Sequence, residues 1–155
     1  MRDEAATLAL GAALASGARA GRVLWLHGEL GAGKTTLVRG LLRALGCTGR
    51  VKSPTYTLVE AYVISGLNLY HFDFYRFIDK TEWVSSGFRE YFSTHTVCLV
   101  EWPERAADLL APPDLEVTLA LPAEPISDNA RDATLVARSR EGESWLSSAA
   151  LPSAS

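Results

Sequence analysis

The stretch Gly28-Glu29-Leu30-Gly31-Ala32-Gly33-Lys34-Thr35 decides the fold, because it fits G-x-x-x-x-G-K-[ST] at every fixed position. The glycines of this pattern let the backbone take positive φ angles and approach phosphates closely, and the loop amides donate to anionic oxygens. Lys34 supplies a charge toward the β- and γ-phosphates, and the Thr35 hydroxyl is a ligand for Mg²⁺. Ala32 belongs to the same phosphate cradle, and Thr36 is placed to reach the α-phosphate. The pattern predicts a nucleotide-phosphate site, with a chance match in a glycine-rich turn as the alternative.

The segments on either side of this loop argue against the chance match. Val23-Leu24-Trp25-Leu26 is an apolar run typical of a buried parallel strand. Residues 34–45 carry apolar side chains at helical spacing, and Gly46 is placed to end that helix. Strand, glycine loop and helix follow in the order that a phosphate cradle requires. We therefore predict an α/β fold: a three-layer domain of the P-loop NTPase type with a mainly parallel central sheet.

The remaining periodic segments predict the other elements. We expect a helix over 3–14, a helix from Thr81 to about Phe92, and a buried strand over 96–101. Two strand-like segments, 58–64 and 67–74, flank Ser65-Gly66 and predict an inserted or edge β-hairpin. Alternating residues near 115–121 and 134–138 predict two late strands. We expect one domain over residues 1–141, with a Ser/Ala-rich tail over 142–155 that frays.

Two acidic residues follow predicted strands and are candidates for holding Mg²⁺ or its water shell. Glu101 ends the strand over 96–101, and Asp73 ends Leu69-Tyr70-His71-Phe72. Both would lie at the carboxyl edge of the sheet, where ligands bind in open α/β folds, and spacing does not decide which one ligates the metal. His71 is either a general base or, as we prefer, a packed strand residue with one hydrogen bond. Trp102 either stacks on a base or packs.

Composition and charge exclude several classes. The chain has 155 residues and a formal net charge of −3, with no basic stripe of the kind that grips nucleic acid directly. No apolar run approaches the ~20 residues that span a bilayer, and the acidic N-terminus lacks a signal-peptide layout, so we expect a cytoplasmic protein. Cys47 and Cys98 match no metal or redox spacing. An Asn-Lys-x-Asp element for guanine is missing, which favours ATP over GTP.

Four segments together resemble the TsaE family, the bacterial ATPases of tRNA threonylcarbamoyladenosine (t6A) synthesis. They are the phosphate loop through Thr36, then Val51-Lys52-Ser53-Pro54-Thr55-Tyr56-Thr57-Leu58-Val59-Glu60, His71-Phe72-Asp73-Phe74-Tyr75-Arg76 and Leu99-Val100-Glu101-Trp102-Pro103. The resemblance covers roughly residues 3–139. It implies an ATPase that hydrolyses ATP slowly, associates with TsaD and TsaB, and resets that complex between rounds of tRNA modification. Contact with tRNA would then be indirect, and self-association stays open.

The resemblance also implies a role for each matching residue. Thr35 and Glu101 would be Mg²⁺ ligands, Lys34 would contact the phosphates, and Asp73 would be a functionally important acid. The nucleotide-binding positions implied in addition are Thr7, Ser53, Thr55, Thr57, Trp102 and Arg131. No arginine of the motif segments is an obvious arginine finger, so we expect weak activity that the partners raise. A small P-loop kinase and a nucleotide-gated binding module without turnover are the alternatives.

Overall fold

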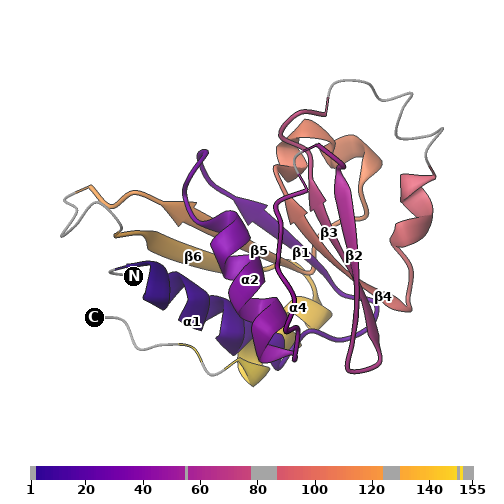
Figure 1. The fold of residues 1–155 in the computed structure, drawn as a ribbon, viewed down its shortest axis with the longest axis horizontal. Coiled ribbons are helices and arrows are strands. Elements are labelled where there is room, and N and C mark those ends of the chain that lie inside the picture. The colour runs from indigo at the N-terminus through magenta and orange to yellow at the C-terminus, as the bar shows by residue number, and fades with distance from the viewer. Residues whose placement is uncertain (1–2, 55, 78–86, 124–129, 150, 152–155) are drawn as a thin grey trace.

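The computed structural model describes residues 3–54, 56–77, 87–123, 130–149 and 151 (Figure 1). Thr55 and the first part of the helix expected from Thr81 lie outside the described residues. Within them, no helix is long and apolar enough to cross a membrane.

A six-stranded sheet of order β2-β3-β4-β1-β5-β6 forms the centre of the fold. Its strands are β1 (Val23–His27), β2 (Val59–Ile64), β3 (Leu67–Asp73), β4 (Thr96–Glu101), β5 (Leu115–Ala120) and β6 (Asp132–Ala137). The four inner strands run parallel, and β2 and β6 pair antiparallel at the two edges. The predicted α/β fold with a mainly parallel sheet and an edge hairpin, β2–β3, is confirmed.

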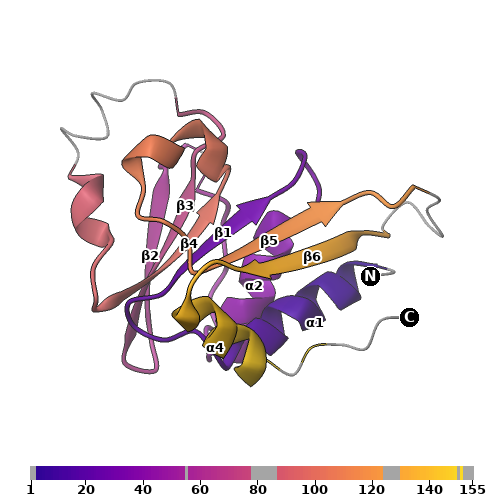
Figure 2. The same cartoon turned by 180° about the vertical axis from the view of Figure 1, so that it is seen from behind.

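Two helices cover one face of this sheet (Figures 1 and 2). Helix α1 (Glu4–Ala15) begins after Asp3, whose side chain accepts a hydrogen bond from the Ala6 amide at 2.9 Å. Helix α2 (Lys34–Ala44) packs tightly on α1: a Cβ at Gly40 would lie 2.2 Å from a backbone oxygen of α1. Their apolar sides join Leu26 and Leu99 of the sheet in the larger hydrophobic core.

The opposite face carries a second apolar cluster, which includes Phe72, Cys98 and Val100. The described residues also form three short 3₁₀ helices: η1 (Phe88–Tyr91), η2 (Pro103–Arg105) and η3 (Ala107–Leu109). The helix expected to end near Phe92 is thus represented in the described residues only by η1.

The tail over 142–155 was expected to fray, but its first part belongs to helix α4 (Arg140–Ser148). The Ser139 hydroxyl accepts from the Gly142 amide at 3.0 Å and caps the helix. Trp145 is fully buried, and its indole N–H donates to the Leu14 carbonyl of α1 at 2.8 Å. The Ser16 hydroxyl donates to the Ser148 carbonyl at 2.8 Å, so the last turn is also attached to α1.

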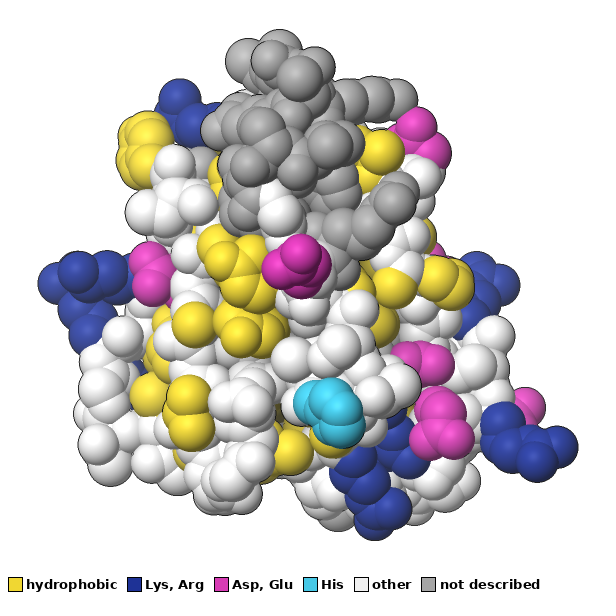
Figure 3. All heavy atoms as spheres, turned by 90° about the vertical axis from the view of Figure 1, so that its right-hand side faces the viewer, with side chains coloured by type: hydrophobic (Ala, Val, Ile, Leu, Met, Phe, Trp, Pro, Cys, Tyr) yellow, Lys and Arg dark blue, Asp and Glu magenta, His cyan; other side chains and the backbone are white. Residues whose placement is uncertain are grey.

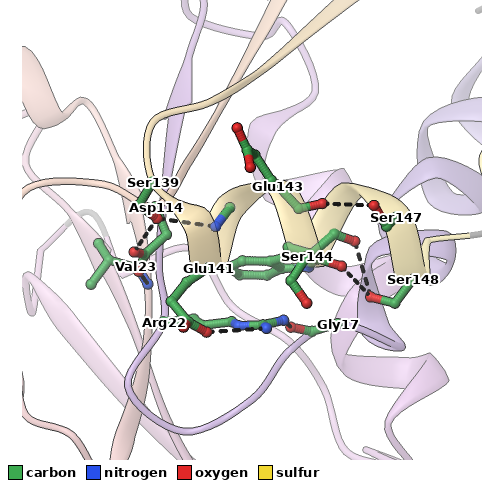
Figure 4. A network of polar contacts seen from close by, with 12 residues as sticks. Gly17, Arg22, Val23, Asp114, Ser139, Glu141, Glu143, Ser144, Ser147 and Ser148 are labelled. Carbon is green, nitrogen blue, oxygen red and sulfur yellow. Dashed lines mark hydrogen bonds and ion pairs between the residues drawn. The ribbon is translucent and has the colours of Figure 1, made fainter.

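A polar network fixes the start of α4 to the sheet (Figure 4). Asp114 accepts from the Ser139 hydroxyl at 2.7 Å and from the Val23 amide at 2.8 Å. The buried Arg22 guanidinium donates to the Gly17 carbonyl at 2.7 Å and to Glu141 at 3.3 Å. A segment whose composition suggests fraying is therefore ordered by contacts with residues more than a hundred positions away.

Candidate nucleotide-binding site

The phosphate loop lies between β1 and α2, at the carboxyl edge of the parallel strands. Gly28 has φ +147° and an added Cβ would stand 2.6 Å from the Leu119 carbonyl oxygen. Gly33, the residue before α2, has φ +106°. Both positions need glycine, for the backbone angle and, at Gly28, for the close approach of β5.

The loop borders an open cavity of about 340 Å³. Besides the loop and the start of α2, its lining comes from the segments after β3 and β4 and from Ser53. The lining residues are Leu30, Gly31, Ala32, Gly33, Lys34, Thr35, Thr36, Ser53, Asp73, Tyr75, Arg76, Glu101 and Trp102.

Lys34 is almost completely buried at the inner wall of this cavity. Its ammonium group donates to the Gly28 carbonyl and lies 3.6 Å from the centroid of the Trp102 ring. Burial lowers the pKa of Lys34, although Glu101 and other carboxylates act to raise it. The lysine is thus held by a carbonyl and an aromatic face, both weaker partners for a cation than a phosphate.

Thr35 and Glu101 meet at the same wall. The Thr35 hydroxyl lies 3.1 and 2.9 Å from the two carboxylate oxygens of Glu101, which is itself 2% exposed. Thr35 stands in the first turn of α2, and Glu101 is the last residue of β4. The fold therefore brings together the hydroxyl and the carboxylate that were predicted to share a metal ion.

Asp73 lies beside Glu101, because the two residues are register partners on the parallel strands β3 and β4. One Asp73 oxygen accepts from the Ser53 hydroxyl at 3.1 Å, and the other accepts from the Tyr75 amide at 2.9 Å. Ser53 belongs to the loop that was predicted to lie near the γ-phosphate. The carboxylate and this hydroxyl form one hydrogen-bonded unit on the cavity wall.

His71 lies one layer deeper than these groups and has no exposed surface. Its Nε2 is 2.5 Å from Glu101 Oε2. The preferred interpretation, a packed strand residue with a hydrogen bond, agrees with this geometry. The partner of that bond is the carboxylate predicted to ligate the metal.

Trp102 follows Glu101 with φ +58°, a left-handed conformation that a bulky residue rarely adopts. This turn brings its ring over Lys34 and 5.0 Å from the ring of Tyr75, centroid to centroid. The ring therefore lines the cavity and packs on Lys34 and Tyr75, which line it too.

Thr7 and Arg131 lie on the other side of the loop. Together with Glu4, Thr36 and the loop glycines they line a smaller cavity of about 170 Å³. Arg131 donates through Nε to the Ala32 carbonyl at 3.2 Å and through Nη2 to the Gly31 carbonyl at 3.3 Å. Arg131 thus holds two loop carbonyls, and Thr7 lines the same cavity beside the loop from the other end of the chain.

A cluster of charged residues supports the loop from the end of β1. His27, the residue before Gly28, lies 3.2 Å from Glu104 and 2.9 Å from Glu116. Arg138 of the edge region also donates to Glu116. Burial raises the pKa of Glu116, but the hydrogen bonds from Arg138 and His27 outweigh it, and the pKa lies below its usual value.

Some predicted site residues lie outside the two cavities, and some residues that line the cavities were not predicted. The exposed Thr57 lies 3.5 Å from Glu60 and is not among the described residues that line either cavity. Tyr75 and Arg76 line the larger cavity and were not assigned a role, although both belong to the segment that begins at His71. Their position directly after Asp73 was the available signal.

Comparisons with known proteins agree with this geometry. Residues 1–130 match the family model for the threonylcarbamoyl adenosine biosynthesis protein TsaE. The tRNA threonylcarbamoyladenosine biosynthesis protein TsaE of Haemophilus influenzae is 45% identical over 125 residues, covering 81% of this chain and 76% of that protein. The protein of the same name from Bacillus subtilis is 42% identical over 113 residues, covering 73% of this chain and 70% of that protein.

The fold has a solved counterpart as well. The crystal structure of Bacillus subtilis YdiB superposes with a TM-score of 0.76 at 31% sequence identity, covering 95% of this chain and 88% of that one. Fold, phosphate loop and sequence matches agree, and the chain belongs to the TsaE family, whose members are named for the biosynthesis of threonylcarbamoyladenosine in tRNA.

Proposed function

We propose that the chain is a Mg²⁺-dependent ATPase that acts with TsaD and TsaB in tRNA threonylcarbamoyladenosine synthesis and resets their complex by hydrolysing ATP. The observation that carries this proposal is the contact of the Thr35 hydroxyl with the Glu101 carboxylate, at 2.9 and 3.1 Å, beside the buried Lys34. A hydroxyl, a carboxylate and an ammonium group converge there on a glycine loop of positive φ.

The donor set fits magnesium. Mg²⁺ prefers oxygen ligands and takes one or two protein groups, with phosphates and water completing its shell. Thr35 and Glu101 would provide these two oxygen donors. When bound there with ATP, Mg²⁺ would supply neutralisation of the phosphate charge.

The chain's own groups account for the remaining requirements of hydrolysis. Loop amides donate to the phosphates, and Lys34 exchanges the Gly28 carbonyl and the Trp102 ring for a γ-phosphate oxygen. The unit of Asp73 and Ser53 orients the attacking water, because it stands on the same wall as Glu101. Thr7, Thr36, Trp102 and Arg131 are proposed to contact the rest of the nucleotide.

We propose slow turnover without partners, and the position of Arg76 supports this: among the described residues it is the one arginine that lines the larger cavity. The Arg76 guanidinium lies 4.8 Å from the ring centroid of the exposed Tyr56. A phosphoryl-transfer site without an engaged arginine loses a factor of ~10³–10⁵ in rate. Partner binding is proposed to raise the rate.

Contact with tRNA is proposed to be indirect. The net charge is −3, and on the face drawn in Figure 3 the described Lys and Arg side chains stand apart at the rim instead of forming one patch. Affinity for nucleic acid depends chiefly on clustered basic groups.

The test is phosphate release from Mg·ATP by the purified chain, with and without TsaD and TsaB. Lys34→Ala is expected to lose nucleotide affinity, and Glu101→Ala to lose turnover more than binding. Ser147→Ala, an exposed change on α4, is the matched control and should behave as the original chain. Equal rates with and without the partners would contradict activation. Phosphate on an acceptor would indicate a kinase, and ATP binding without phosphate release would indicate a binding module.

A further inference from the structure

We propose that His71 is a positioning residue for Glu101: its Nε2–H holds one carboxylate oxygen so that the other faces the magnesium ion. This inference rests on the proposed function, since it concerns the metal site of the same cavity. It adds a residue that touches neither nucleotide nor metal and acts through Glu101.

The geometry of the buried pair carries the first step. His71 is 0% exposed, Glu101 is 2% exposed, and Nε2 lies 2.5 Å from Oε2. Glu101 also accepts from the Thr35 hydroxyl with both oxygens. A carboxylate that ligates magnesium only accepts hydrogen bonds, so the proposal requires the hydrogen of the His71 contact on Nε2.

The topology makes this contact specific. His71 and Asp73 are two residues apart on β3, so they lie on the same side of the strand. Asp73 is the register partner of Glu101 on β4. His71 therefore lies two residues before the edge, behind Glu101 as seen from the cavity. An imidazole reaches the Glu101 carboxylate from this position.

The cost of placing a histidine there argues for a function. Among the described residues, His71 Nδ1 is a buried atom without a hydrogen-bond partner. An unpartnered buried polar atom costs roughly 1–3 kcal/mol, and the neighbouring strand positions Leu69 and Leu99 are apolar. An apolar side chain at position 71 would avoid this cost, whereas only a donor orients the carboxylate.

The consequence concerns which oxygen of Glu101 is available. Thr35 would leave Glu101 when its hydroxyl ligates magnesium, whereas the bond from His71 stays. Oε2 is then occupied and Oε1 faces the cavity with a fixed direction. Hydrogen bonds of this kind to ligating carboxylates typically change metal affinity ~10–100-fold.

The experiment measures the Mg²⁺ dependence of binding for a non-hydrolysable ATP analogue, so that no turnover is needed. His71→Leu is expected to raise the Mg²⁺ concentration for half-maximal binding by about tenfold or more, with unchanged affinity in EDTA. His71→Gln places an amide donor at similar reach and should restore the dependence to within about threefold. His71→Asn, which is polar but too short to reach Glu101, should behave like His71→Leu and replaces it if the leucine variant does not fold.

A second measurement separates positioning from packing. In a Glu101→Ala background, His71→Leu should change the Mg²⁺ dependence no further, because the two residues act as one unit. Unchanged Mg²⁺ dependence in both the leucine and asparagine variants would overturn the inference. So would an equal loss in the glutamine variant, because packing and not the donor would then matter. If the original chain itself binds the analogue independently of Mg²⁺, the proposed function fails, which is a distinct result.

Discussion

Replacing Trp145 by alanine is expected to lower the free energy of unfolding by about 4 kcal/mol. The ring is fully buried, and truncation of such a side chain costs about 3–5 kcal/mol. The lost indole hydrogen bond to Leu14 is part of this cost, but the Leu14 carbonyl keeps a backbone donor, the Gly17 amide at 3.2 Å. With about 2 cal/mol/K of unfolding entropy per residue, a chain of 155 residues should lose roughly 12 °C in Tm.

The assay is thermal and urea unfolding followed by circular dichroism. Trp145→Phe is the matched control, because it keeps most of the apolar contact and loses the indole N–H. It should cost about 1–2 kcal/mol, or roughly 3–6 °C. If both variants melted within about 2 °C of the original chain, α4 would not belong to the cooperative core, and our account of its docking on α1 would be refuted.

Two further outcomes are expected. Gly28→Ala should lose nucleotide binding and about 2 kcal/mol of stability. Gly31→Ala, whose added Cβ meets no atom within 4 Å, should lose about 1 kcal/mol of stability. Equal losses for the two variants in urea unfolding and in titration with an ATP analogue would contradict the clash argument. Hydrogen bonds from Arg138 and His27 lower the pKa of Glu116 against the effect of burial. The ionised Glu116 therefore stabilises the fold above pH 4.5, the usual pKa of the group, and this stabilisation is lost as the pH falls through the folded-state pKa. Glu116→Gln should therefore be less stable than the original chain near pH 7, and the difference should shrink as the pH falls through the folded-state pKa of Glu116; a pH-independent difference in urea unfolding would count against this explanation.

The elements around the phosphate loop were predictable because their signals are local. The apolar run of β1, the fixed glycines and the helical spacing of α2 all lie within 23–45. The strand over 96–101 was predicted with its observed bounds, because an apolar run, residues 97–100, ends in the carboxylate of Glu101. The rule that parallel strands present their carboxyl ends at one edge placed both Glu101 and Asp73 near the phosphate loop, and only the family resemblance paired Thr35 with Glu101.

Other features depend on contacts that no local pattern records. Composition predicted a fraying tail over 142–155, yet Trp145 within it donates a hydrogen bond to the Leu14 carbonyl. The contact of His71 with Glu101 depends on β3 lying next to β4, and the sequences of the strands do not determine the order of strands in the sheet. The hydrogen bonds of Arg131 to the loop join residues about a hundred positions apart.

The contacts of Thr7 and Arg131 with the phosphate loop have a consequence for how the protein is made. A chain still being synthesised possesses the complete loop motif once residue 35 has emerged, but the arginine that holds the loop carbonyls follows 96 positions later in the sequence (residue 131). A nascent chain shorter than this has the motif without the hydrogen bonds from Arg131, the residue just before β6. The loop motif alone is therefore not sufficient: segments that lie far before and far after it in the sequence must fold against it before its carbonyls are held.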